Sequence, residues 1–257
     1  MKIIVVSETN TASKNIGNIL RERSLRARFF EVRAGVLELD KYESEFLKLA
    51  PELIIVASSH KSEAGIPMLN CHTTGNWGDD VSHKGLPRKL SIAPALYLRA
   101  GVLEFQKLKQ ENPKLKDYEI GLEATHHSPT IDFPVMFVEV GSTEKQWGDL
   151  EACKAAADVI CKLATETPEK VTTAIGFGGG HYCPHFNKRL ITEKIAFGHI
   201  CPKYAADAVD EETVIQAFNK TVPKPDFAMI EWKGLSGLQR KKIIDILDKN
   251  GLPWKKF

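Results

Sequence analysis

The feature that most constrains the fold is a series of short, continuous apolar runs that alternate with amphipathic stretches. Residues 3–6 and 53–57 are aliphatic throughout and are followed by polar residues. Runs of this length are typical of strands that are covered on both faces. Residues 14–23 and 91–110 instead carry apolar side chains at helical spacing. The sequence therefore predicts an α/β fold, with one mixed, mostly parallel sheet between two layers of helices.

The same patterns continue along the chain. Short strands are also expected at residues 29–32, 36–39, 67–72, 119–123, 135–140, 171–177 and 195–200. Further helices are expected at residues 143–164, 211–219 and 238–249, and Thr143 with Gln146 forms a capping-box pattern at the first of these. We predict a single three-layer domain over residues 1–257. An insertion near residues 70–89 and a C-terminal extension from about residue 222 are compatible with it.

The composition limits the class of protein. The chain is 43% hydrophobic and 26% charged, and its net charge of +2 excludes a generically polycationic nucleic-acid binder. Five cysteines without a Cys-x-x-Cys pair argue against a disulfide framework. No apolar run approaches the roughly 20 residues that a membrane-spanning helix needs, and the first strand-like run is too short for a signal peptide. We expect a cytoplasmic, monomeric protein.

A glycine-rich segment, Gly176–His185, follows one of the predicted strands. Its sequence Gly-His-x-Cys-Pro at residues 180–184 occurs again at residues 198–202, also after an apolar run. Glycine has no Cβ, so such a loop lets the backbone approach a ligand closely. The histidine that follows the glycines is then placed to act on that ligand, which predicts a functional site here.

Histidines collect at the ends of the predicted strands. Seven of the eight follow such strands: His60, His72, His126, His127, His181, His185 and His199. If these strand ends share one edge of the sheet, the side chains converge on one cleft, as in doubly wound folds. His126 and His127 are adjacent, and successive side chains of an extended backbone alternate. We therefore expect only one of the two to face the site.

Three kinds of histidine site fit these residues. The pairs His181 with Cys183 and His199 with Cys201 would supply a tetrahedral zinc site, although this spacing is uncommon for structural zinc. A catalytic zinc held by histidines and a carboxylate is favoured over it. The candidate carboxylates are Glu123, Glu139 and Glu144. A metal-free histidine site is the third alternative.

Several catalytic motifs are absent from the sequence. It contains no G-x-G-x-x-G, no G-K-[ST] after the glycines, no H-E-x-x-H and no G-x-S-x-G. The residues alone therefore indicate an α/β protein with a histidine-rich cleft, most simply a hydrolase or a transferase.

Several separated motifs resemble one family over nearly the whole chain. They are Ser58–His60, Cys71–Asn76, Thr125–Thr130, Glu139–Glu144, Gly179–Tyr182 and Gly198–Ile200. This set is similar to the archaeal and plant type of D-aminoacyl-tRNA deacylase. The resemblance implies hydrolysis of the ester between a D-amino acid and the 3′ end of tRNA. It also implies zinc dependence and an architecture related to peptidyl-tRNA hydrolases and phosphorylases.

The resemblance suggests roles for individual residues. His126, His181 and His199 are expected to be metal ligands or the general base, with Glu139 or Glu144 orienting them. Backbone N–H groups of Gly178–Gly180 would stabilise the oxyanion. The side chains and glycines expected to contact the substrate are Ser58, His60, His72, Asn76, Thr125, His127, Ser142, Gly179 and Gly180.

The body of the tRNA would be held through its phosphates and 2′-hydroxyls. The basic residues expected to do this are Lys14, Arg21, Arg23, Arg26, Arg88, Lys89, Arg99 and Arg240–Lys242. Two rival functions share parts of this pattern. One is a zinc-dependent amidase or peptidase for a small substrate, and the other is a non-catalytic RNA-binding protein.

Overall fold

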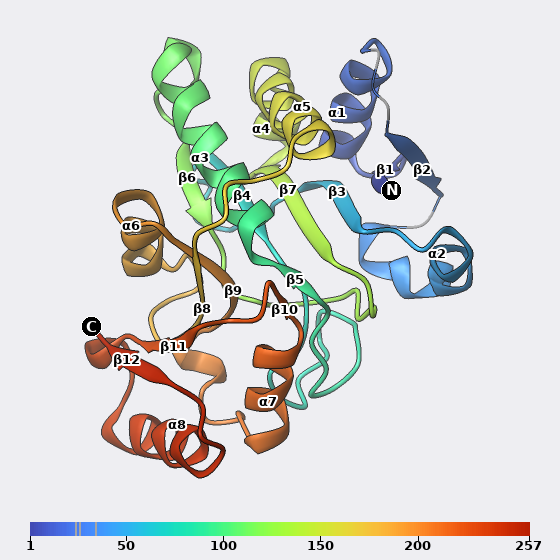
Figure 1. The fold of residues 1–257 in the computed structure, drawn as a ribbon. Coiled ribbons are helices and arrows are strands. Elements are labelled where there is room, and N and C mark those ends of the chain that lie inside the picture. The colour runs from blue at the N-terminus through green and yellow to red at the C-terminus, as the bar shows by residue number, and fades with distance from the viewer. Residues whose placement is uncertain (24, 26, 34) are drawn as a thin grey trace.

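The computed structural model describes residues 1–23, 25, 27–33 and 35–257. The strands fall mainly into two sheets, which Figure 1 shows at the centre and at the lower left of the molecule. The expected mixed, mostly parallel α/β fold is confirmed, but the strands are divided between these sheets and do not form one continuous sheet.

The larger sheet has six strands in the order β2-β1-β3-β7-β4-β6. Their bounds are β1 Lys2–Ser7, β2 Arg28–Val32, β3 Leu53–Ser59, β4 Met68–His72, β6 Glu119–Leu122 and β7 Val135–Gly141. Neighbouring strands are parallel except at one place, where β4 runs antiparallel to β7. The carboxyl ends of β4 and β6 therefore lie at the opposite edge from those of β3 and β7.

The smaller sheet has four parallel strands in the order β12-β11-β8-β9. Their bounds are β8 Thr172–Phe177, β9 Ile195–Cys201, β11 Phe227–Ile230 and β12 Trp254–Lys256. A two-stranded pairing joins β5 (Ala93–Pro94) to β10 (Thr221–Val222). The segment after residue 222 thus supplies two strands of this sheet, and the segment after residue 70 begins inside β4 of the larger one.

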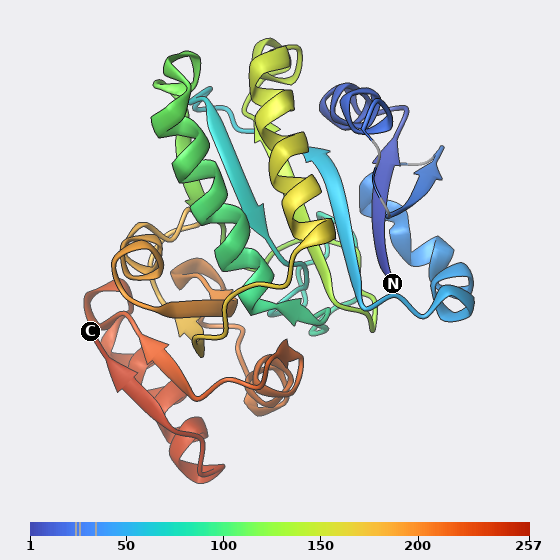
Figure 2. The same cartoon turned by 45° about the horizontal axis from the view of Figure 1, so that its top comes forward.

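Helices cover both sheets. Helices α1 (Thr11–Arg21), α3 (Ala95–Glu111) and α5 (Leu150–Thr165) pack on one face of the larger sheet, where Figure 2 shows α3 in green beside α5 in yellow. The opposite face packs against η1 (Val36–Tyr42) and α2 (Glu43–Leu49). The remaining helical segments are η2 (Pro113–Leu115), α4 (Glu144–Trp147), α6 (Pro184–Thr192), η3 (Lys203–Ala205), α7 (Glu211–Asn219), η4 (Trp232–Gly234) and α8 (Gly237–Lys249).

One apolar core joins the two sheets. Buried side chains of the larger sheet, such as Ile4 and Val138, belong to the same cluster as Ala174 and Phe197 of the smaller sheet. A second cluster behind the smaller sheet packs its strands against α7 and α8. Burial of this kind stabilises the fold by about 25 cal/mol per Å² of apolar surface, which favours a fixed arrangement of the sheets.

The sequence patterns predict most helices and strands correctly but misplace some of their ends. The expected capping box of Thr143 and Gln146 is present, but α4 ends at Trp147 and Asp149 caps a separate helix, α5. The predicted strand at 36–39 is the 3₁₀ segment η1. Helix α1 begins at Thr11, earlier than the predicted residue 14, and its cap is Asn10, whose side-chain oxygen accepts from Ser13 N at 2.9 Å. Among the described residues, no helix is long and apolar enough to cross a membrane.

Candidate active site

Two buried carboxylates lie where the larger sheet reverses direction. Glu139 is in the middle of β7, and its partner in the antiparallel register is Asn70 of β4. Glu123 follows β6 directly, and Asn70 Nδ2 donates a hydrogen bond to Glu123 Oε1. Both carboxylates are almost fully buried. Buried charges need partners, so these positions point to a polar cluster inside the fold.

Glu123 is the centre of this cluster. Its Oε1 lies 3.0 Å from His60 Nδ1, and its Oε2 lies 3.3 Å from His181 Nε2 and 3.5 Å from His126 Nε2. The three histidines come from three different segments. His181 arrives from the smaller sheet, because Ala124 N donates to His181 O at 2.8 Å. The cluster therefore forms at the junction of the two sheets.

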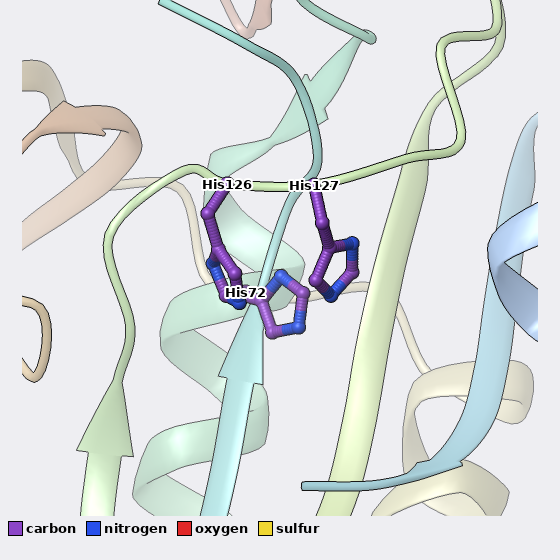
Figure 3. A group of neighbouring side chains, drawn as sticks. All are labelled: His72, His126 and His127. Carbon is purple, nitrogen blue, oxygen red and sulfur yellow. The ribbon is translucent and has the colours of Figure 1, made fainter. Parts of the chain in front are cut away.

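Glu139 gathers a second set of histidines. Its Oε2 lies 3.5 Å from His72 Nε2 and 3.8 Å from His60 Nδ1. Figure 3 shows the rings of His72, His126 and His127 beside one another, with centroids 4.3 to 4.8 Å apart. His60 thus bridges the two carboxylates, and the histidines form one continuous group around them.

The backbone sets the tautomer of these three rings. His126 Nδ1 lies 2.7 Å from Ala124 O, His72 Nδ1 lies 3.1 Å from Thr73 O, and His127 Nδ1 contacts Ser128 O. A carbonyl only accepts, so each Nδ1 carries the proton and each Nε2 of a neutral ring offers a lone pair. Metal-binding histidines show this same arrangement, in which the second nitrogen donates to a backbone carbonyl.

The electrostatics of the cluster favour ionised carboxylates beside a neutral His126. Burial, together with repulsion from His127 and His72, holds the pKa of His126 well below its usual value. Burial also lowers the pKa of His127, to about 4. Burial opposes ionisation of Glu123, yet the imidazoles of His181 and His60 beside it keep the pKa of that carboxyl well below its usual range.

These residues fit a metal ion. Three groups have ligand atoms within 4.8 Å of one another: His72, His126 and His127; Glu123, His126 and His181; and His60, Glu123 and Glu139. In the described part of the chain, the buried Glu123 Oε2 has no hydrogen-bond partner, and it faces the lone pair of a neutral His126 Nε2. Two acceptors 3.5 Å apart are compatible only if a cation or a proton lies between them. The nitrogen and oxygen donors are those that zinc prefers.

A cavity of about 460 Å³ opens beside the cluster. Its lining includes His126, His127 and His181, together with Trp77 and Tyr204. Tyr204 Oη lies 3.1 Å from His181 Nδ1. The Trp77 indole N–H is buried without a hydrogen-bond partner among the described residues. The cavity therefore offers an aromatic and polar surface directly against the histidines.

Comparison with known proteins shows the family to which the chain belongs. The family model for D-aminoacyl-tRNA deacylase matches residues 47–255. A D-aminoacyl-tRNA deacylase of Methanocaldococcus jannaschii is 34% identical over 99% of this chain and 98% of its own length. The chain belongs to the D-aminoacyl-tRNA deacylase family.

Two further similarities concern a second relative and the fold. A D-aminoacyl-tRNA deacylase of Methanosarcina barkeri is 40% identical over 79% of this chain and 65% of its own length. A crystal structure described as a conserved protein of unknown function superposes with a TM-score of 0.91 at 25% identity. It covers 100% of this chain and 95% of that one. The fold is therefore shared over the full length.

The structure brings several of the residues predicted for a deacylase into one place. His60, His72, His126, His127, His181 and Glu139 all lie in the cluster. Ser58 is the register partner of Glu139 on β3 and is buried beside it. Glu123 was one of three candidate carboxylates in the sequence, and the geometry makes it the central one.

Other predicted residues lie elsewhere or are already engaged. His199 is not in the cluster, because its Nδ1 lies 3.1 Å from Thr125 Oγ1 and its Nε2 lies 3.0 Å from Ser91 O. Glu144 is exposed at the start of α4, so it does not orient the histidines. A ligand needs a free lone pair, and both nitrogens of His199 are occupied.

Three predicted substrate contacts use their polar groups within the protein. Asn76 Nδ2 donates to Lys84 O and Leu86 O, and Ser142 Oγ donates to Ile66 O at 2.5 Å. The hydroxyl of Thr125 holds His199, although Thr125 also lines the cavity. Asn76 and Thr125 line the cavity, whereas Ser142 is not among its lining residues.

The glycine loop also differs from the prediction. Gly178 N donates to Cys201 O at 2.8 Å and Gly179 N donates to Gly234 O at 3.2 Å. These two N–H groups are therefore not available to an oxyanion. The two His-x-Cys pairs do not form a zinc site among the described residues, since Cys183 and Cys201 are in none of the ligand groups. Burial raises the pKa of both thiols well above its usual value.

The adjacent histidines do not alternate. Both His126 and His127 line the cavity, because His127 has a φ of 43° and the backbone there is not extended. Sequence reasoning also missed Asn70, Tyr182, Tyr204 and Trp77. Tyr182 immediately follows His181, and its hydroxyl lies 3.2 Å from His60 Nε2. The only sequence signal for Tyr182 was its position in the motif Gly179–Tyr182.

Proposed function

We propose that this chain hydrolyses the ester of D-aminoacyl-tRNA at the Glu123 cluster, with zinc as its cofactor. The reaction releases a free D-amino acid and free tRNA. The observation that carries the proposal is the buried Glu123 carboxylate in contact with His60, His126 and His181, the last two of which line an open cavity. Membership of the deacylase family supplies the substrate, and we further propose that the protein acts in the cytoplasm as a monomer.

The chemistry needs three things: an activated water, stabilisation of the tetrahedral oxyanion, and a proton for the leaving oxygen. Bound zinc would lower the pKa of a water toward about 7 and so supply the nucleophile. Glu123, His126 and the other members of the three ligand groups would hold the ion. The ring nitrogens that donate to backbone carbonyls keep these ligands oriented.

The leaving group is the ribose oxygen at the tRNA 3′ end. Water adds to the ester carbonyl, the bond from the carbonyl carbon to the ribose oxygen breaks, and that oxygen takes up a proton. His181 lies at the mouth of the cluster, about a third exposed, with Tyr204 Oη on its Nδ1. We assign the proton transfer to His181 because it joins the buried carboxylate to the cavity.

The test compares D-tyrosyl-tRNA and L-tyrosyl-tRNA as substrates, with and without a chelator, and measures zinc in the purified protein. Release of only the D-amino acid, abolished by chelation, is expected. Release that persists without metal would remove zinc from the proposal. No release from either substrate would remove the deacylase function.

The role of Glu123 can be tested by substitution. Glu123→Gln removes the charge that holds three histidines, so kcat/KM should fall at least about 100-fold, with loss of bound zinc. Glu144→Gln changes an exposed carboxylate outside the cluster and should keep wild-type activity and zinc content. Equal activity of the two variants would show that Glu123 is not part of the reaction.

A further inference from the structure

The basic residues first expected to hold the tRNA are mostly neutralised. Arg21 pairs with Glu31 at 2.7 Å, Arg88 pairs with Asp79 and Asp210, and Lys89 pairs with Glu212. Lys14, Arg23, Arg99 and Lys241 also have carboxylate partners, and Lys242 Nζ donates to a backbone carbonyl. Arg26 lies outside the described residues. A cation that already has a carboxylate partner gains less from a phosphate.

A different set of cations is exposed and unpaired. Lys203, Lys233, Lys255 and Lys256 have no carboxylate partner in the part of the chain that the structure describes. They lie around η4 and the edge strand β12 of the smaller sheet. A surface that carries unpaired positive charge attracts a polyanion.

An exposed tryptophan stands among these cations. Trp232 is 37% exposed, with the Arg240 guanidinium 4.8 Å and the Lys256 ammonium 5.0 Å from its ring centroid. Arg240 is held in place because its Nη1 donates to Trp232 O and Leu235 O. Aromatic rings interleaved with cations are typical of surfaces that bind single-stranded nucleic acid.

This surface continues from the active-site cavity. Tyr204 lines that cavity and also a depression of about 540 Å³ with Lys203 and Gly234. Lys233, which directly precedes Gly234, lines a third depression of about 490 Å³ with Trp232 and Lys256. We call the residues Lys203, Tyr204, Trp232, Lys233 and Lys256 the Trp232 track.

A buried carboxylate beside the track holds an exposed histidine in place. Glu231 Oε1 accepts from His185 Nδ1 at 2.6 Å, and Glu231 Oε2 has no hydrogen-bond partner among the described residues. Glu231 is 6% exposed and lines the third depression, whereas the His185 side chain is 65% exposed. The bond to Glu231 orients the exposed imidazole and leaves its Nε2 for a ligand. The ester chemistry uses neither residue.

From these observations we infer that the single-stranded 3′ end of the substrate RNA lies along the Trp232 track. The esterified nucleotide occupies the active-site cavity, the preceding base lies against Tyr204, and a further base stacks on Trp232. Phosphates meet Lys203, Lys233 and Lys256. The long, flexible stem of Lys256 lets its ammonium move from the ring to a phosphate when a base enters. This inference rests on the proposed function.

The test measures binding of uncharged tRNA, so it does not depend on catalysis. Intact tRNA is compared with the same tRNA trimmed of its single-stranded 3′ nucleotides. Trp232→Ala should weaken binding of intact tRNA about tenfold, because one base loses its stacking partner. It should leave binding of trimmed tRNA unchanged, and with charged tRNA it should raise KM while kcat stays at the wild-type value.

Two control variants keep the result interpretable. Trp232→Phe retains an aromatic face and should restore most of the affinity, which separates stacking from misfolding. Lys241→Ala removes an exposed cation that is paired with Asp245 and should leave binding unchanged. Equal affinity of Trp232→Ala and wild type for intact tRNA would overturn the inference, as would equal losses for intact and trimmed tRNA. Wild-type protein that binds intact tRNA better than trimmed tRNA but releases no D-amino acid would instead contradict the proposed function.

Discussion

At the scale of single residues, the site depends on which ring nitrogen carries the proton. His72, His126 and His127 each place Nδ1 against a carbonyl one or two residues away. This local contact leaves Nε2 facing the carboxylates or the cavity. The left-handed backbone at His127, with φ of 43°, is what lets two adjacent histidines share one site. Short-range geometry therefore fixes the orientation of these three rings.

His199 has a structural role that can be tested through pH. It is fully buried, and burial lowers its pKa to about 3, whereas an unfolded histidine titrates near 6.5. Between these values the unfolded chain binds a proton that the folded chain does not. The contribution of His199 to the free energy of unfolding is thus present at neutral pH and is lost as pH falls from about 6.5 toward 3.

We therefore predict that the free energy of unfolding of the wild type falls more steeply with acidification than that of His199→Asn. The difference in slope should approach about 1.4 kcal/mol per pH unit. Urea unfolding at several pH values below neutrality measures both slopes. Parallel curves for the two proteins would show that His199 is protonated in the folded state.

At the scale of elements, two arrangements build the site. The antiparallel seam between β7 and β4 sets Glu139 beside Asn70, and Asn70 in turn holds Glu123. The loop after β8 turns through Gly178 and Gly179, whose φ values are 114° and 75°. Its glycines pack against Glu231, and the loop then delivers His181 to the cluster. The glycines thus let the chain turn and let its backbone pack closely against Glu231.

The glycine loop provides a matched pair of variants. A Cβ on Gly179 would clash with the Glu231 carboxylate and would stand on a left-handed backbone, so Gly179→Ala should cost about 1–3 kcal/mol of stability. A Cβ on Gly180 would meet nothing within 4 Å, so Gly180→Ala should change stability by less than about 0.5 kcal/mol. Thermal unfolding of both variants measures the difference, and similar losses would argue against close packing on Glu231.

At the scale of the whole molecule, the junction of the two sheets creates the site. Ala124 N donates to His181 O at 2.8 Å, and Thr125 N donates to Ile200 O at 2.9 Å. These backbone bonds join the loop after β6 to the smaller sheet. The shared apolar core holds the two sheets in a fixed arrangement. Glu123 and His181 are far apart in sequence and meet only because of this packing.

The distribution of charge over the molecule gives a salt prediction. The net charge of +2 offers little general attraction, so RNA binding should depend on the few unpaired cations of the track. With three phosphate contacts, the logarithm of the association constant should fall with the logarithm of salt with a slope of about −2. Filter binding across a salt titration measures the slope. Lys233→Ala should make it shallower and Lys241→Ala should not, and a salt-independent affinity would exclude phosphate contacts.

Much of this protein was determined by the sequence itself. Continuous apolar runs predict buried strands because only a sheet covered on both faces suits them, and this indicated the α/β class. The histidines at strand ends and the glycine-rich segment marked the site, since their chemistry is local. The family resemblance also rested on short motifs, each of which is contiguous in the chain.

The tertiary structure decided what depends on contacts between distant segments. It placed β4 antiparallel to β7, which no local pattern encodes, and so made Glu123 the centre of the cluster. It also left Glu144 exposed at the start of α4. It occupied both nitrogens of His199 with Ser91 and Thr125. It also paired most of the predicted RNA-binding cations with carboxylates. Burial and ion pairing arise only when the chain is packed. The sequence therefore determines which chemical groups are present, and packing determines which of them face the substrate.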